Sequence, residues 1–159
     1  SSPITDLESS LLYGYIKYRD GNNDKDIAAD VKLNHKLSDF TEMSLKYKYG
    51  IEGTVNSDYL RYYVNSFSFN LKHKFVSRLT ADFSASYERD LYRKRDLLIA
   101  SSSIDDKTRD RYTLGLGLSY SLTKWASLGA AYSRSDINSE FADETYSDNK
   151  YSCNFKMTF

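Results

Sequence analysis

The residues best suited to chemistry are two histidines, one cysteine, two closely spaced glycines and one basic cluster. His35 and His73 are far apart in the sequence, and both fall on the apolar side of alternating segments near short turns. This placement favours hydrogen-bonded structural residues over a catalytic or metal-binding pair. A hydrolase needs a nucleophile, a histidine and an acid at one rim, and neither histidine is expected at the rim with the long loops. We therefore expect no enzyme activity, no cofactor and no metal site.

Cys153 is the only cysteine, which excludes an internal disulfide and a multi-cysteine metal site. Its phase in the surrounding pattern predicts a small apolar filler. Gly115 and Gly117 have the spacing of a phosphate loop, but they lie inside an alternating segment with no helix after it. We interpret them as positions where inward neighbours pack closely or where the strand bends.

The basic cluster Arg93, Lys94 and Arg95 lies in a long polar segment. Its cations could hold the phosphates of lipopolysaccharide through charge-assisted hydrogen bonds, and the alternative is a solvated loop. The chain as a whole has 22 basic and 22 acidic residues and a formal net charge of zero. This balance argues against nucleic-acid binding, which requires a basic surface.

These side chains are positioned by segments in which apolar and polar residues alternate. From Tyr112 to Leu122 every second residue is apolar and the residues between them are small or polar. The last segment places Phe155, Met157 and Phe159 on one side. Strict alternation is typical of strands with one apolar and one polar face. No apolar run approaches the roughly 18–20 residues of a membrane-spanning helix.

Eight such segments follow one another as consecutive hairpins. We predict a polar lead-in at residues 1–9 and long polar loops near 20–25, 52–58, 91–110 and 136–149, which alternate with very short turns. The first strand, between residues 10 and 19, has two competing phases. We favour the apolar face that turns Lys17 to the polar side, which consists of Leu12, Gly14, Ile16 and Tyr18.

An up-and-down meander with an even number of strands can close into a barrel. We therefore predict that residues 1–159 form a single all-β domain, an eight-stranded antiparallel up-and-down transmembrane β-barrel. The apolar side chains are too bulky for so narrow an interior, so they should face lipid, while lysines and carboxylates pair inside. The predicted lipid-facing residues are Leu45, Phe67, Phe69, Phe83, Leu114, Leu116, Leu118, Leu128 and Phe155.

Aromatic residues near the strand ends support this orientation. Tyr63, Tyr87, Tyr112 and Tyr132 lie toward the long loops, and Phe40, Phe75, Trp125 and Phe159 lie toward the short turns. Two belts of amphipathic rings are typical of the two interfaces of a membrane. The alternative is ordinary strand propensity, because Tyr and Phe favour strands in any case.

The stretch from Tyr112 to Tyr132, followed by a polar loop and the segment Tyr151 to Phe159, resembles the C-terminal hairpins of bacterial outer-membrane β-barrels. It is similar in particular to the β-barrel porin group associated with exopolysaccharide systems. The resemblance implies a terminal assembly signal at Phe155, Met157 and Phe159, with Met157 where an aromatic residue is more usual. It also implies a bacterial outer-membrane location. The implied partners are outer-membrane lipid and lipopolysaccharide, the barrel-assembly machinery through the C-terminal strand, and an envelope protein that the sequence does not identify.

Three functions follow as hypotheses. The first is an outer-membrane barrel with a plugged polar interior and a structural or recognition role through extracellular loops. The second is transport, with the chain as the C-terminal part or a subunit of a larger porin or polysaccharide-export barrel. The third is a soluble lipocalin-like binder, which the volume of the apolar side chains disfavours.

Overall fold

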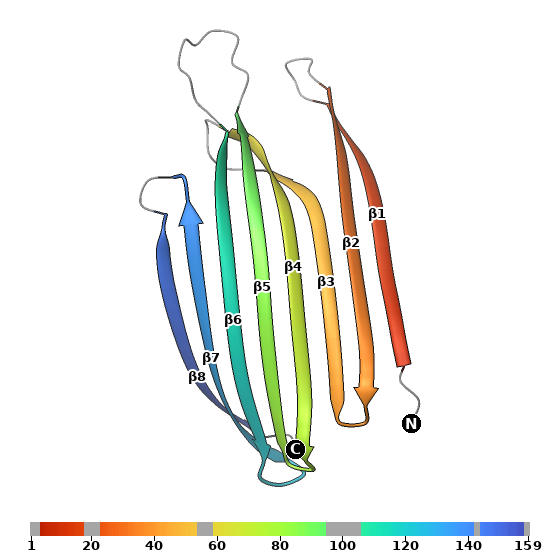
Figure 1. Cartoon of the computed structure of the whole chain (residues 1–159), viewed down its shortest axis with the longest axis vertical. Coiled ribbons are helices and arrows are strands. Elements are labelled where there is room, and N and C mark those ends of the chain that lie inside the picture. The colour runs from red at the N-terminus through yellow and green to blue at the C-terminus, as the bar shows by residue number, and fades with distance from the viewer. Residues whose placement is uncertain (1–3, 18–22, 54–58, 95–105, 142–143, 158–159) are drawn as a thin grey trace.

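The computed structural model of the chain describes residues 4–17, 23–53, 59–94, 106–141 and 144–157. They form one antiparallel sheet of eight strands, which lie side by side in sequence order (Figure 1). The strands are β1 (Ile4–Lys17), β2 (Asn23–Ser38), β3 (Thr41–Gly53), β4 (Tyr59–Val76), β5 (Leu79–Lys94), β6 (Lys107–Ser121), β7 (Ala126–Ser139) and β8 (Tyr146–Met157). Within these residues there is no helix long and apolar enough to cross a membrane.

The described sheet is open, whereas the sequence predicts a closed eight-stranded barrel. Each strand contacts only its neighbours in sequence, and β1 and β8 form two separate edges (Figure 1). An eight-stranded barrel leaves an interior only wide enough for its own side chains. The polar face of this sheet carries the large rings of Tyr62, Tyr92 and Phe141 at one end, which need more room. The all-β, antiparallel, up-and-down meander itself is confirmed.

The strands are longer than the sequence pattern predicts. β1 begins at Ile4, so most of the expected polar lead-in at 1–9 is strand, because Leu7 pairs with Leu33 and extends the alternation. β5 continues to Lys94 and β6 begins at Lys107, which shortens the expected loop at 91–110. The expected loop at 136–149 shortens in the same way, because β7 ends at Ser139 and β8 begins at Tyr146.

Cross-strand pairing assigns the faces, because residues directly opposite each other project from the same side of a sheet. Leu45 lies opposite Phe69, Phe83 opposite Leu116, and Leu128 opposite Phe155. These pairs belong to one continuous apolar face, and the intervening residues form the polar face. The exposed large apolar side chains include Leu116 and Phe155, each 58% exposed.

The face assignment predicted for the first strand is wrong. Leu11 lies opposite Ala29 and Tyr13 opposite Ile27, so the odd-numbered residues of β1 share the apolar face. Leu12 lies opposite Ala28 and Gly14 opposite Asp26, both on the polar face, while the Ile16 side chain and Tyr18 lie outside the described part of the chain. The register with β2 decides which residues of β1 lie on the apolar face. The preference of one residue, Lys17, for the polar face is too weak to change it.

Candidate functional site on the polar face

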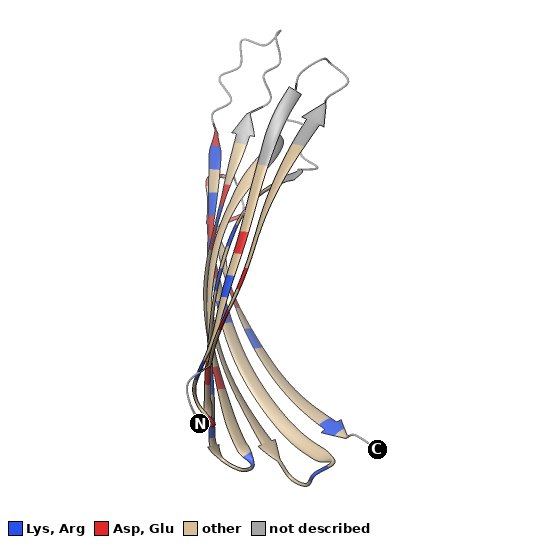
Figure 2. Ribbon diagram, turned by 90° about the vertical axis from the view of Figure 1, so that its right-hand side faces the viewer, with Lys and Arg blue, Asp and Glu red and all other residues tan. Residues whose placement is uncertain are grey.

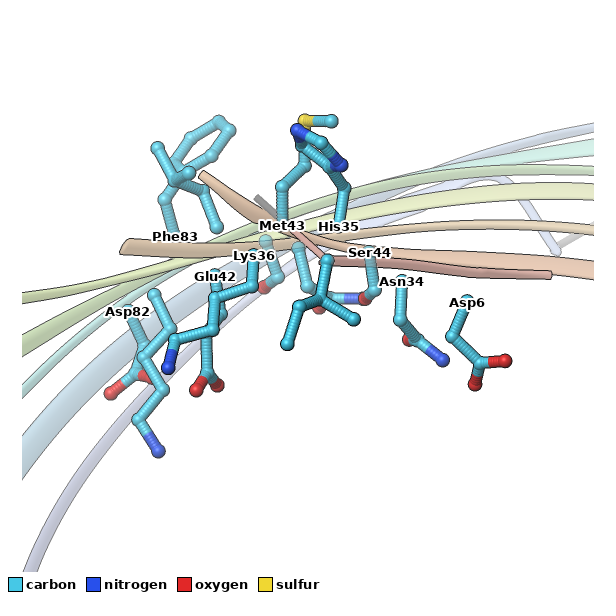
Figure 3. Close-up of a pocket in the computed structure, with 14 residues that line it drawn as sticks. Asp6, Asn34, His35, Lys36, Glu42, Met43, Ser44, Asp82 and Phe83 are labelled. Carbon is cyan, nitrogen blue, oxygen red and sulfur yellow. The ribbon is translucent and has the colours of Figure 1, made fainter. Parts of the chain in front are cut away.

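The polar face presents short polar and charged side chains from every strand. Figure 3 shows this separation near the short turns: His35, Met43 and Phe83 project to one side, while Lys36, Glu42 and Asp82 project to the other. On β6 the polar face carries no side chain at two positions, which are occupied by Gly115 and Gly117. A Cβ atom at Gly115 would collide with the hydroxyl of Ser84, so glycine there allows the close packing predicted from the sequence.

Charged side chains of opposite sign alternate across β1 to β5 on this face. Lys46 Nζ lies 2.9 Å from Asp30 Oδ2, which is one of the pairings expected inside the barrel. Lys32 instead pairs with Glu8 at 3.6 Å, and Glu88 pairs with Arg111 at 2.7 Å. These half-exposed pairs each contribute little to stability, but together they make the face hydrophilic without a strong net charge.

The most buried part of the sheet is also on the polar face, at the end with the long loops. We call it the loop-end cluster, and it consists of Tyr62, Val64, Asp90, Tyr92, Arg109, Ile137 and Phe141. Val64, Tyr92 and Ile137 are 3%, 8% and 6% exposed. The register brings these residues together, because Tyr62 lies opposite Tyr92 and Asp90 lies opposite Arg109. They come from β4, β5, β6, β7 and the connection that follows β7.

Asp90 and Arg109 form the polar centre of the cluster. The Arg109 Nε and Nη2 groups both donate to Asp90 Oδ2, at 3.0 and 2.6 Å. Asp90 Oδ1 is buried and has no hydrogen-bond partner among the described residues. The Arg109 guanidinium also lies 5.5 Å from the centre of the Tyr92 ring, within the range of a cation–π contact. A buried carboxylate is tolerated here because the guanidinium compensates its charge.

Aromatic rings pack around this ion pair. The Tyr62 and Tyr92 rings stack with their centres 4.8 Å apart, and the edge of Phe141 meets Tyr92 at 4.9 Å. Burial raises the pKa of the Tyr92 phenol, so this group stays neutral at physiological pH. On β5 and β6 the cluster lies closer to the long loops than Tyr87 and Tyr112, which face the opposite side of the sheet.

The connection between β7 and β8 is fastened to the polar face through the same cluster. Phe141 reaches past β6 to contact Tyr92 of β5, and the Lys107 ammonium lies 4.8 Å from its ring centre. Glu144 lies 3.7 Å from Arg109, and the Glu140 carboxylate accepts a hydrogen bond of 2.6 Å from the backbone of Thr108. Both ends of this connection therefore bend toward the polar face.

Sequence reasoning missed the loop-end cluster. Asp90 was assigned to no strand, and Tyr92 and Arg109 fell in a segment expected to be a loop. The signal that identifies them is continued alternation, since Glu88, Asp90 and Tyr92 share one phase and face Arg111, Arg109 and Lys107. Tyrosines on the polar phase of a strand are the clue that this face has its own packed region.

Toward the long loops, the apolar face carries a row of tyrosines, which we call the tyrosine belt. Beyond it lies a pair of charged residues, Arg134 and Asp136, which we call the polar collar. The rings of Tyr87 and Tyr112 contact each other in a tilted arrangement with their centres 4.9 Å apart, and those of Tyr132 and Tyr151 do so at 5.0 Å. Above them on the same face, Arg134 binds Asp136 through two hydrogen bonds of 3.0 Å. At about 3.4 Å per residue and a tilt of about 40°, the stretch from Tyr112 to Leu122 spans about 26 Å of height, close to the apolar band of outer-membrane barrels.

The nine predicted lipid-facing residues all lie on the apolar face, and their contact with lipid stays a prediction. Phe155 and Met157 also lie on this face, on the edge strand β8, while Phe159 lies outside the described residues. The backbone of Arg93 and Lys94 belongs to the end of β5, and Arg95 lies outside the described residues. The contact of these three residues with lipopolysaccharide is therefore untested.

The two histidines lie on the apolar face, each beside a threonine hydroxyl. His35 Nδ1 is 2.7 Å from Thr5 Oγ1, and His73 Nδ1 is 2.8 Å from Thr41 Oγ1. Cys153 is exposed on the same face, opposite Ala130. Within the described part of the chain, no three His, Cys, Asp or Glu side chains are close enough together to hold a metal ion.

An all-β meander with one apolar face, one charged face and a tyrosine belt is typical of the strands that form a membrane β-barrel. A family model confirms the class: the one described as Putative beta-barrel porin 2 matches residues 13–159. The chain belongs to this family, as the resemblance of its C-terminal hairpins indicates. No curated protein and no solved structure matches the chain.

Proposed function

We propose that the chain forms part of the wall of an outer-membrane porin, with its polar face lining an aqueous passage for small hydrophilic solutes. The observation that carries this proposal is the separation of the two faces along all eight strands, together with the height of the apolar band. Leu116 and Phe155 would contact lipid, and the ion pair of Lys46 with Asp30 would face water. Family membership supports the same class.

The open edges favour a wide barrel over a small plugged one. In a closed eight-stranded barrel the side chains would fill the interior, but β1 and β8 of this sheet do not meet. A wall that continues with further strands beyond β1 and β8 would leave a lumen. The loop-end cluster would then project from one side of that lumen and narrow its mouth. Recognition through extracellular loops is untested, because much of the long loops lies outside the described residues.

The free edge of β8 supports a second element of the proposal, recognition by the barrel-assembly machinery. β8 ends the sheet, and its outer backbone groups are unpaired within the described structure. An edge strand can bind another strand by backbone hydrogen bonds, and alternate side chains give specificity. On the apolar face, the barrel-assembly machinery would recognise the side chains of Phe155 and Met157.

Conductance of the whole porin that contains this chain, purified and inserted into planar lipid bilayers, tests the transport proposal. Steady channels are expected, with ion selectivity that shifts when Lys46 on the polar face is changed to Glu. The matched control is Arg89→Glu, because Arg89 lies on the opposite face and should leave selectivity unchanged. Correct insertion without conductance would instead support a plugged barrel, and an equal shift in both variants would contradict the assignment of the faces.

A further inference from the structure

A hollow lies on the polar face over β6 and extends from β5 on one side to β8 on the other. Its volume is about 500 Å³, which is within the range of small-molecule binding sites. Its lining includes Gly115 and Gly117 of β6 and the hydroxyl-bearing residues Ser84, Ser133 and Ser152. Figure 2 shows that the sheet is a curved wall, which allows a hollow to form on one of its faces. In the proposed function this hollow opens to the aqueous passage.

Gly117 leaves a space that close packing does not require. A Cβ atom there would lie 3.6 Å from the Cβ atom of Asp82 and 3.9 Å from that of Ala131, which are ordinary van der Waals contacts. Gly115 differs, because a Cβ atom there would collide with Ser84. A side chain at position 117 would therefore fit between its neighbours and occupy the hollow. The glycine keeps this part of the polar face open to a solute.

Two groups of opposite charge border the hollow from opposite sides. Asp82 projects from β5 and is exposed, and Lys150 projects from β8 with its side chain 76% exposed. Asp82 lies opposite Lys72 of β4, but these two described side chains do not form an ion pair. Lys150 Nζ lies 3.2 Å from Asp148 Oδ2, and so exposed a pair is weak. The three N–H groups of the ammonium therefore leave a donor for a further acceptor.

This arrangement fits a solute with an ammonium group at one end and a carboxylate at the other. The Asp82 carboxylate accepts from an ammonium, Lys150 donates to a carboxylate, and serine hydroxyls donate to and accept from the amides between them. Three strand spacings of about 4.8 Å separate β5 from β8, and a peptide of two or three residues, about 7–10 Å long, matches this width better than a single amino acid. We propose that the hollow binds short zwitterionic peptides, with the ammonium at Asp82 and the carboxylate at Lys150. This inference rests on the proposed function, because an aqueous passage brings solutes to the polar face.

Block of the ion current by added peptide measures this binding. The whole porin that contains this chain is inserted into planar lipid bilayers, and triglycine is added while the current is recorded. We expect a saturable decrease of the current, because a bound peptide obstructs the passage. Triglycine with both ends capped has the same backbone and no charge, and it should require at least a tenfold higher concentration. Each exposed charge contact contributes about fivefold to affinity, and the doubly capped peptide loses two of them.

Peptides capped at one end assign the two charges. Asp82→Asn should weaken block by amide-capped triglycine, which keeps its ammonium, about fivefold, and it should leave block by acetyl-capped triglycine unchanged. Lys150→Gln should have the reverse effect. The matched control is Glu42→Gln, which removes an exposed acid from the same face outside the hollow and should leave block by every peptide unchanged. Equal effects of Asp82→Asn and Glu42→Gln, or equal block by free and doubly capped triglycine, would overturn the proposal.

Gly117→Val tests the space itself, because it fills the hollow without a change of charge. It should weaken block by triglycine more than tenfold while the ion current persists. Ser68→Val adds similar bulk to the polar face on β4, away from the hollow, and should leave the block unchanged. A porin that conducts ions but is not blocked by triglycine refutes only this inference, whereas an inserted porin that does not conduct refutes the proposed function.

Discussion

Asp90 and Arg109 face each other across β5 and β6, and both guanidinium hydrogen bonds end on the same carboxylate oxygen. The second oxygen is buried and has no hydrogen-bond partner among the described residues, and within them Arg109 is the cation that compensates this carboxylate. Removing one member of a buried pair leaves the other uncompensated, which costs far more than the pair itself contributes. The loop-end cluster is therefore the part of the polar face most sensitive to mutation.

Asp90→Asn should lower the free energy of unfolding by roughly 3 kcal/mol, because the partly buried Arg109 then keeps only the more distant carboxylate of Glu144, at 3.7 Å. Glu88→Gln is the matched control, since Glu88 pairs with Arg111 one step along the same two strands but is half exposed. Its cost should stay below about 1 kcal/mol. Urea unfolding of the chain refolded in lipid vesicles measures both. Equal costs would show that Asp90 is not buried in the folded protein.

Phe141→Ala should release the connection between β7 and β8 from the polar face. An aromatic edge contact contributes about 0.5–1.5 kcal/mol beyond burial, so hydrogen exchange at the Glu140 amide should accelerate roughly three- to tenfold. That amide donates to the Thr108 carbonyl at 3.0 Å in the intact protein. Tyr151→Ala, on the opposite face, should leave this exchange rate unchanged. Faster exchange in both variants would mean that general loosening of the sheet, and not the contact with Tyr92, controls the connection.

The meander could be predicted from the sequence because period-2 alternation is strong and the short turns are clear. That Leu128 and Phe155 share the apolar face follows from it directly. The phase of β1 could not be predicted locally, because Leu11 and Leu12 are both apolar and only the register with β2 decides between them. The loop-end cluster escaped for a different reason. Its aromatic rings lie on the polar phase, where alternation alone predicts small or charged side chains.

The position of an introduced charge within the apolar band should determine how much it lowers the free energy of unfolding. Leu116→Arg lies near the middle of the band and should lower the free energy of unfolding by about 2–4 kcal/mol, whereas Leu122→Arg at its end should cost about 0–1 kcal/mol. Both side chains are exposed in the structure, so burial against protein does not distinguish them. Unfolding in vesicles provides the comparison. Similar costs at both positions would argue against a hydrocarbon slab around this face.

The Asp136 carboxyl, in the polar collar beside the tyrosine belt, should have a pKa below its usual value. The Arg134 guanidinium and then the Ser147 hydroxyl lower the pKa of the Asp136 carboxyl by hydrogen bonding to its ionised form. Because the folded pKa is depressed, this stabilisation is present above the unfolded value near pH 4 and disappears as the pH falls through the folded pKa. Carboxyl carbon NMR should show the Asp136 pKa rising in Arg134→Gln. An unchanged pKa would contradict the bidentate contact.

The orientation of the sheet is tested most directly by spin labels placed one at a time along β6, at positions 113 to 118, in a Cys153→Ser background. Accessibility to oxygen, which concentrates in lipid, is compared with accessibility to a water-soluble nickel complex in vesicles. We predict a two-residue period, with oxygen highest at 114, 116 and 118 and nickel highest at 113, 115 and 117. The opposite phase, or no period at all, would contradict a wall whose leucines face lipid.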